Sequence, residues 1–183
     1  MDYVMNIAGL DRSLHLCKVT DDLYIAGFIM FNDVELTIAV ARDLLAKAPD
    51  FDVIVTAESK GIPLAYEMSR QSGKPYIVAR KGGKLYMQDI VSISVNSITT
   101  DHLQVLCLGK DERDVIFGKR VLIVDDVIST GSSLETLEKL VDEVGGDIVG
   151  KMTVLAEGNA AERDDIIFLE VLPLFNSDGS IKL

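Results

Sequence analysis

The sequence has few of the residues that stabilise secreted and metal-binding proteins. It contains two cysteines and two histidines in 183 residues. Cys17 and Cys107 each lie in a hydrophobic, strand-like segment, so we expect both to be buried, reduced thiols of a cytoplasmic protein. His15 and His102 stand alone, so the sequence offers no cysteine or histidine cluster with the spacing of a metal site.

Long hydrophobic runs are also missing. The longest apolar runs are far too short to span a membrane. The first residues, MDYVMNIAGLDRS, lack the basic stretch and following apolar stretch of a secretory signal. The chain has only four prolines, no repeats and no linker-like stretches, so residues 1–183 predict a single cytoplasmic domain with no membrane partner.

Basic residues are scarce, since 18 lysines and arginines stand against 29 acids and the net charge is −11. A nucleic-acid-binding protein needs a basic surface, so we expect no nucleic acid among the partners. The segment 59–88 differs, with six basic residues and one acid, a net charge of +5 that leaves −16 elsewhere. A solvated surface could carry this excess, and so could a site for an anionic ligand. The six are Lys60, Arg70, Lys74, Arg80, Lys81 and Lys84.

Strand-like and helical patterns alternate along the chain. We expect two strands within 14–31 and single strands at 51–59, 75–80, 102–108, 119–125, 150–157 and 166–175. Helices are expected at 33–47, 63–72 and 132–144; the first has capping-box spacing at Asn32 and Glu35, and the last at Ser132 and Glu135. This order predicts an α/β fold with a largely parallel central sheet flanked by helices.

The stretch VLIVDDVISTGSS (121–133) combines two unusual features. Asp125 and Asp126 follow an apolar strand, and ligands of parallel sheets bind beyond the carboxyl ends of the strands. Two carboxylates ~4 Å apart at an effective dielectric of ~20 repel by about 4 kcal/mol. Solvent, a cation or the hydroxyl donors of a ligand must offset this repulsion, and a vicinal diol supplies two such donors side by side.

Small residues follow the acids and precede a predicted helix. Gly131 permits a tight turn, and the helix start offers unpaired N–H donors and the positive end of its dipole. These features predict a phosphate site formed by Ser129, Thr130, Gly131, Ser132 and Ser133. A diol site beside a phosphate site indicates a ribose 5-phosphate. Each half alone has another interpretation, because receiver domains have an acidic pair after a strand and a serine-rich turn is often a helix cap.

The same stretch resembles the 5-phosphoribosyl 1-pyrophosphate (PRPP) signature of type I phosphoribosyltransferases. TAESKGIPLA (56–65) is similar to the pyrophosphate-binding loop of that family. VARKGGKLYMQDI (78–90) is similar to the Arg-Lys strand end and flexible loop of the adenine and xanthine enzymes. The resemblance covers roughly 51–157. It implies the type I fold, with a core at about 33–157 and a small hood formed by about 1–31 and 157–183.

The resemblance also implies roles for single residues. Asp125 and Asp126 would bind the ribose hydroxyls, and residues 129–133 the 5-phosphate. Asp126 is the one candidate for a general acid or base, although a diol acceptor is its simpler role. Mg²⁺ would be carried by PRPP, with no direct protein ligand, and relatives are commonly homodimers. The pyrophosphate would lie near Glu58, Ser59, Lys60, Gly61, Arg80, Lys81 and Lys84.

The implied reaction is displacement of pyrophosphate from C1 of PRPP by a purine nitrogen, with a loop hinged at Gly82-Gly83 closing over the site. The chain departs from the adenine enzymes at DIVSISVNSIT (89–99), where they have a Ser-Tyr pair and a nearby Glu. It departs from the xanthine enzymes at Glu157, which Gly158 rather than Lys follows. The sequence therefore predicts an adenine phosphoribosyltransferase-like enzyme, with a xanthine or hypoxanthine/guanine enzyme as the alternative.

Two non-catalytic alternatives remain. A PRPP-sensing regulator would share the signature, but repressors of this kind have an additional DNA-binding domain, and the roughly 50 residues before Phe51 contain no basic helix. A receiver domain would have its acidic pair after the first strand, whereas several strands are expected before the one that leads to Asp125 here.

Overall fold

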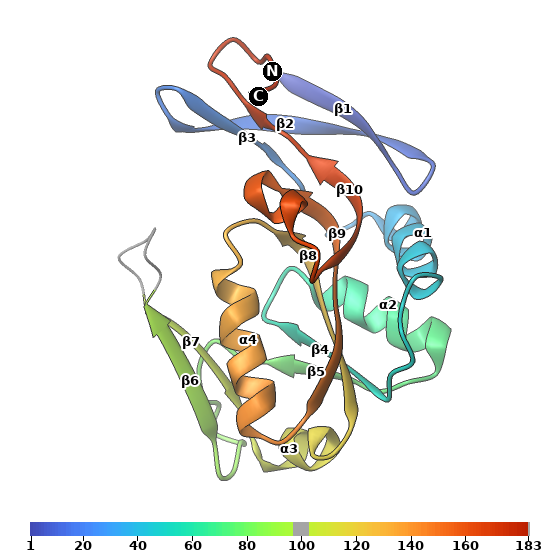
Figure 1. The fold of residues 1–183 in the computed structure, drawn as a ribbon, viewed down its shortest axis with the longest axis vertical. Helices are drawn as coiled ribbons and strands as arrows, with labels where there is room; N and C mark the ends of the chain where they lie inside the picture. The colour runs from blue at the N-terminus through green and yellow to red at the C-terminus, as the bar shows by residue number, and fades with distance from the viewer. Residues whose placement is uncertain (97–102, 183) are drawn as a thin grey trace.

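A computed structural model describes residues 1–96 and 103–182, and its centre is a five-stranded parallel sheet (Figure 1). The strand order is β10-β9-β8-β4-β5. The expected parallel α/β fold is therefore confirmed. The strands are β4 (Val53–Ala57), β5 (Tyr76–Ala79), β8 (Arg120–Ile128), β9 (Asp147–Glu157) and β10 (Ile167–Leu172).

Helices cover both faces of this sheet because its strands bury alternate side chains on opposite sides. Ile54 packs into a cluster with α1 and α2, whereas Val53 and Val55 pack into a second cluster with α3 and α4. The helices are α1 (Val34–Leu45), α2 (Ile62–Ser72), α3 (Lys110–Ile116) and α4 (Ser132–Glu143). None of the helices in the described ranges is long and apolar enough to cross a membrane.

A second, antiparallel sheet lies above the parallel sheet and contains both ends of the chain (Figure 1). Its order is β1-β2-β3-β11, with β1 (Asp2–Ile7), β2 (Leu10–Thr20), β3 (Leu23–Gly27) and β11 (Leu174–Phe175). We call this sheet the hood. Its strands β2 and β3 correspond to the two expected within 14–31, and β1 was not predicted. The strand β10, expected to belong to the hood, instead pairs with β9 in the parallel sheet.

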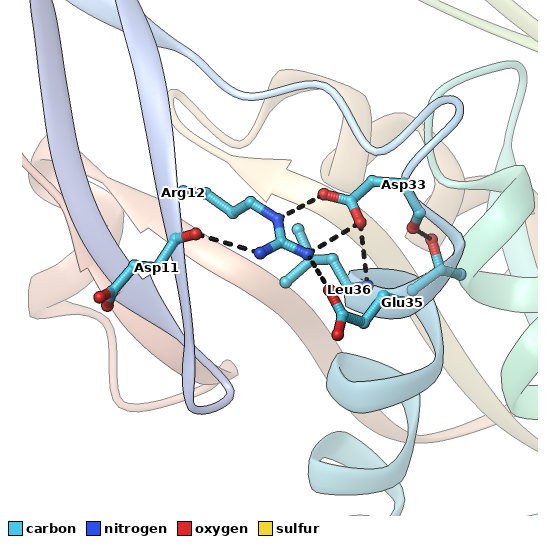
Figure 2. Close-up of polar contacts among 6 residues, drawn as sticks. Asp11, Arg12, Asp33, Glu35 and Leu36 are labelled. Atoms are coloured by element: carbon cyan, nitrogen blue, oxygen red, sulfur yellow. Dashed lines mark hydrogen bonds and ion pairs between the residues drawn. The ribbon is translucent and has the colours of Figure 1, made fainter.

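One arginine ties the hood to the core, as Figure 2 shows. Arg12 of β2 donates two hydrogen bonds to Asp33, at 2.6 and 3.1 Å, and one to Glu35 at 2.9 Å. Asp33, not the expected Asn32, is the N-cap of α1, because its carboxylate accepts the N–H of Leu36 at 3.0 Å. The hydrogen bond from Arg12 is the main cause that lowers the pKa of Asp33.

The segment expected to be the loop 89–99 is partly a strand. Strand β6 (Val91–Asn96) pairs antiparallel with β7 (Leu103–Leu108), and both contact α4. Backbone hydrogen bonds between Arg80 and Cys107, at 3.0 and 2.8 Å, join this hairpin to the end of β5. Residues 97–99 and His102 lie outside the described residues.

The two cysteines differ in burial, so the prediction for Cys17 was wrong. Cys107 is 1 % exposed, whereas Cys17 lies on the exposed side of β2. Leu14 and Leu16 of that strand are buried, and successive side chains of a strand point to opposite faces. The hydrophobic character of the segment therefore belongs to one face only, and Cys17 lies on the other.

Candidate active site

A cavity of about 640 Å³ lies at the carboxyl ends of β4 and β8. The lining residues come from four segments, 57–60, Lys81, 105–106 and 125–134. The cavity thus brings together the acidic pair, the predicted phosphate site and most of the predicted pyrophosphate loop. Three residues predicted for the pyrophosphate, Gly61, Arg80 and Lys84, are not among its lining residues.

The acidic pair lies within β8, which continues to Ile128 instead of ending at Asp125. Asp126 is only 2 % exposed, and within residues 1–96 and 103–182 its Oδ2 accepts no hydrogen bond. The Nζ of Lys60 lies 3.4 Å from that oxygen. One lysine from the neighbouring loop therefore offsets part of the repulsion expected from the sequence.

The two aspartates also affect each other directly. Asp125 Oδ1 accepts the backbone N–H of Asp126 at 2.9 Å. Burial, and after it the charge of Asp126, raises the pKa of Asp125 to about 7. The site thus contains a carboxyl group whose pKa lies near neutral pH, and a ligand with hydroxyl donors would stabilise its ionised form.

The loop 58–61 lies directly over Asp125, and only glycine fits at its end. A Cβ on Gly61 would lie 2.3 Å from Thr56 Oγ1 and 2.9 Å from Asp125 Oδ1. The Glu58–Ser59 peptide bond in this loop is cis. Although Gly61 is not a lining residue, its missing side chain lets the loop and its Lys60 approach the acidic pair.

The Arg80 side chain and the Lys81 backbone contact Glu58 at the start of this loop. Glu58 accepts the backbone N–H of Lys81 at 3.0 Å, and its Oε1 lies 3.7 Å from Arg80 Nη1. The hydrogen bond from Lys81 is the main cause that lowers the pKa of Glu58. Arg80 therefore acts on the cavity through Glu58 instead of lining it.

The small-residue turn (129–133) forms the opposite wall of the cavity. Gly131 has φ +81° and is the N-cap of α4. The capping box expected from Ser132 and Glu135 is not formed, because Ser132 is the first helical residue and Glu135 pairs with Lys139 at 2.6 Å. A glycine N-cap has no side chain to occupy the first N–H groups of α4, so they can bind an anion.

Several residues at the site were not found from the sequence. Val105 and Leu106 of β7 line the cavity. Glu157 is the last residue of β9, and burial raises its pKa, although the charge of Lys60 opposes this rise. The position of Glu157 at the carboxyl end of a strand was the signal that could have found it. Arg163, whose guanidinium contacts the small-residue turn, gave no local signal at all.

Comparisons with known proteins identify the family. The model of the phosphoribosyl transferase domain matches residues 31–179. The chain belongs to the phosphoribosyltransferase family. The resemblance noted in the sequence is thereby confirmed.

Curated relatives include enzymes and a regulator. An adenine phosphoribosyltransferase of Cenarchaeum symbiosum is 37% identical over 128 residues, 69% of this chain and 72% of the relative. A hypoxanthine/guanine phosphoribosyltransferase of Methanothermococcus okinawensis is 31% identical, over 79% of this chain and 73% of the relative. The purine biosynthesis transcriptional repressor PurR of Bacillus subtilis is 31% identical over 69% of this chain. The chain spans 45% of that repressor, and 56% of the similar adenine enzyme of Thermotoga petrophila.

Solved structures of adenine phosphoribosyltransferases have a similar fold. The adenine phosphoribosyltransferase of Saccharomyces cerevisiae matches with a TM-score of 0.69 and 19% identity, covering 86% of this chain and 92% of that one. The adenine phosphoribosyltransferase of Rhodothermus marinus matches with a TM-score of 0.63 and 25% identity, over 76% and 79% of the chains.

The first prediction concerns Gly61. We expect Gly61→Ala to lower the free energy of unfolding by about 1–3 kcal/mol, because the added methyl group overlaps Thr56 and Asp125. Urea denaturation measures this change. The control is Gly82→Ala, since an added Cβ at Gly82 meets no described atom within 4 Å. Equal stability of the two variants would contradict the close approach.

The second prediction concerns the pH dependence of stability. The pKa of Asp125 is raised from 3.8 to about 7, so between these values the folded chain binds a proton that the unfolded chain releases. The stability that this proton contributes is present at low pH and is lost as pH rises through about 7.

Asp125→Asn lacks this titration. We therefore expect wild-type protein to lose on the order of 2 kcal/mol relative to Asp125→Asn between pH 5 and pH 8. Urea denaturation of both proteins at the two pH values measures the difference, and titrating groups that do not interact with Asp125 cancel in the comparison. A difference that does not change with pH would mean that Asp125 is already ionised at pH 5.

Proposed function

We propose that this protein is an adenine phosphoribosyltransferase-like enzyme. It transfers the 5-phosphoribosyl group of PRPP to a purine base and releases a nucleoside monophosphate and pyrophosphate, as in purine salvage. The observation that carries the proposal is that one cavity joins the acidic pair, the small-residue turn and the loop 58–61. The family match and the similarity to adenine phosphoribosyltransferases support the same activity.

The ribose 5-phosphate half of PRPP fits the walls formed by β8 and α4. Asp125 and Asp126 accept the two ribose hydroxyls, which replaces repulsion between carboxylates by hydrogen bonds. The small-residue turn binds the 5-phosphate through its hydroxyls and the first N–H groups of α4. Asp126 is a diol acceptor in this proposal, and it is also the nearest candidate for a general acid or base.

The pyrophosphate half fits the loop 58–61 and the cations beyond it. Lys60 and Lys81 line the cavity, and Arg80 lies behind Glu58. The leaving pyrophosphate gains negative charge as its bond to C1 breaks, and fixed cations stabilise this charge. We propose the same role for Lys84, in the segment 81–90 between β5 and β6, which would close over the bound substrate.

Mg²⁺ fits this site as an ion carried by PRPP. The pyrophosphate and ribose oxygens of PRPP are suitable Mg²⁺ ligands, and Asp126 Oδ2, which is buried without a hydrogen-bond donor in the described residues, is left for a ribose hydroxyl. The part of the chain that the structure describes has no group of three or more His, Cys, Asp or Glu residues that could hold a metal ion. When bound, the ion would neutralise charge on the pyrophosphate oxygens.

We propose adenine as the purine base that the protein uses. Adenine enzymes are among the relatives, and a hypoxanthine/guanine enzyme is similar as well, so xanthine, hypoxanthine and guanine are the alternatives. We propose one domain spanning residues 1–183, acting in the cytoplasm, with the hood covering the base.

A second candidate function is a PRPP sensor without catalysis. The specific observation is the 31% identity to the repressor PurR. Such a sensor would keep the cavity and bind PRPP but would not release pyrophosphate. Binding and turnover together therefore distinguish the two functions.

The third prediction tests catalysis. Wild-type protein with PRPP and Mg²⁺ is incubated in turn with adenine, hypoxanthine, guanine and xanthine, and pyrophosphate release is measured. We expect turnover with adenine. The variant Asp125→Asn with Asp126→Asn should lose at least about a thousandfold in activity while remaining folded by circular dichroism, because the ribose acceptors lose their charge.

The matched control changes another adjacent acidic pair, Asp21→Asn with Asp22→Asn, in the exposed turn between β2 and β3. It should keep wild-type activity. PRPP binding by wild-type protein without turnover of any base would favour the sensor, and full activity of the Asp125/Asp126 variant would reject the site.

The fourth prediction concerns assembly, since we propose a homodimer. Exposed apolar side chains lie along the start of α1 and on the neighbouring α2, which pack together. We expect a dimer in sedimentation equilibrium and a monomer for Ile38→Lys, whereas Val19→Lys, at an exposed position on the hood, should leave the dimer intact. A wild-type monomer would contradict the proposal. The residues are Ile29, Phe31, Val34, Ile38 and Tyr66.

A further inference from the structure

An arginine far along the chain contacts the small-residue turn. Arg163 follows the short helix η1 (Gly158–Glu162) that comes after β9. Its Nη1 lies 2.7 Å from the position that a Cβ on Gly131 would occupy. The guanidinium therefore packs against the backbone of Gly131, in the space that a side chain there would fill.

Other charged groups hold this guanidinium in place. Arg163 donates two hydrogen bonds to Asp165, from Nε at 2.8 Å and from Nη2 at 2.7 Å. Asp165 also pairs with Lys151 of β9, whose Nζ lies 2.8 Å from Glu138 of α4. The hydrogen bonds from Arg163 and Lys151 keep the pKa of Asp165 well below its usual range. The network joins α4, β9 and the segment after β9.

The third nitrogen of Arg163 is the one directed at the turn. In residues 1–96 and 103–182, no acceptor forms a hydrogen bond with Nη1, while Nε and Nη2 are both used by Asp165. The small-residue turn has hydroxyl and N–H groups but no cation of its own. The cavity's lining cations, Lys60 and Lys81, come from other segments.

A phosphate monoester bound in this turn would bring up to two negative charges close to Asp125 and Asp126, and the turn has no cation of its own to offset them. Arg163 is not a lining residue of the cavity, so it acts on such a ligand through the turn. It supports the backbone of Gly131 from outside and adds a fixed positive charge behind the N–H groups that face the ligand.

We propose that Arg163 is a positioning residue for the 5-phosphate end of the substrate. The inference rests on the proposed function, because it assumes that the turn binds the phosphate monoester of a ribose 5-phosphate. Arg163 stabilises the turn in its binding conformation, and Asp165 orients the guanidinium. The pyrophosphate end is bound by a different loop and is independent of Arg163.

This independence gives the fifth prediction. Isothermal titration calorimetry measures the affinity of the full chain for ribose 5-phosphate and, in a separate titration with Mg²⁺, for pyrophosphate. We expect Arg163→Gln to weaken ribose 5-phosphate binding about tenfold and to leave pyrophosphate binding unchanged. The KM for PRPP should rise with a smaller change in kcat.

The matched control is Arg120→Gln. Arg120 forms the same two-bond contact with Asp52, at 3.1 and 2.9 Å, but near the amino end of β8. Its loss should leave both affinities unchanged. Arg163→Lys keeps the positive charge without the two-bond contact to Asp165, so its affinity for ribose 5-phosphate should lie between those of wild type and Arg163→Gln.

Each outcome decides the question. Equal loss of both affinities in Arg163→Gln would indicate general damage and overturn the positioning role, and so would unchanged ribose 5-phosphate binding. If Arg163→Gln does not fold, Arg163→Lys carries the same test by the same two titrations. Wild-type protein that binds neither ligand would overturn the proposed function together with this inference. If wild-type protein binds both ligands but the Arg163 variants do not show the selective loss of ribose 5-phosphate affinity, only the inference is overturned.

Discussion

The buried carboxylate pair at the end of β8 is the constraint on which the site depends. Asp126 is almost completely enclosed, and Asp125 holds its proton up to about pH 7. Lys60, 3.4 Å from Asp126, is the cation that offsets part of their repulsion. A proton on Asp125 offsets more of the repulsion below about pH 7, and the hydroxyl donors of a ligand would stabilise the ionised pair above it.

Two arginines that do not line the cavity lie behind segments that do. Arg80 pairs with Glu58, whose carboxylate also accepts the backbone N–H of Lys81. Arg163 lies against Gly131 of the small-residue turn. Farther away, Arg12 ties the hood to the start of α1 (Figure 2).

Features that depend on a few consecutive residues could be predicted from the sequence, whereas the exact N-cap of α4 and the burial of single residues could not. The alternation of strands and helices was readable because each pattern lies within a few consecutive residues. The prediction of a capping box at Ser132 was wrong, because Gly131, with φ +81°, is the N-cap of α4. The prediction that Cys17 is buried was wrong, because the hydrophobic character of a segment does not reveal which of its residues lie on the buried face.

The parallel α/β fold and the order of acids, small residues and helix in 121–133 follow from local patterns, since hydrophobic periodicity and turn chemistry act over short distances along the chain. The packing of the whole chain brings distant residues to this stretch. Gly61 lies on Asp125 because β4 pairs with β8, and Arg163 reaches Gly131 from the segment that follows β9. Strand order and crossover geometry fix these contacts, and neither is written in any local pattern.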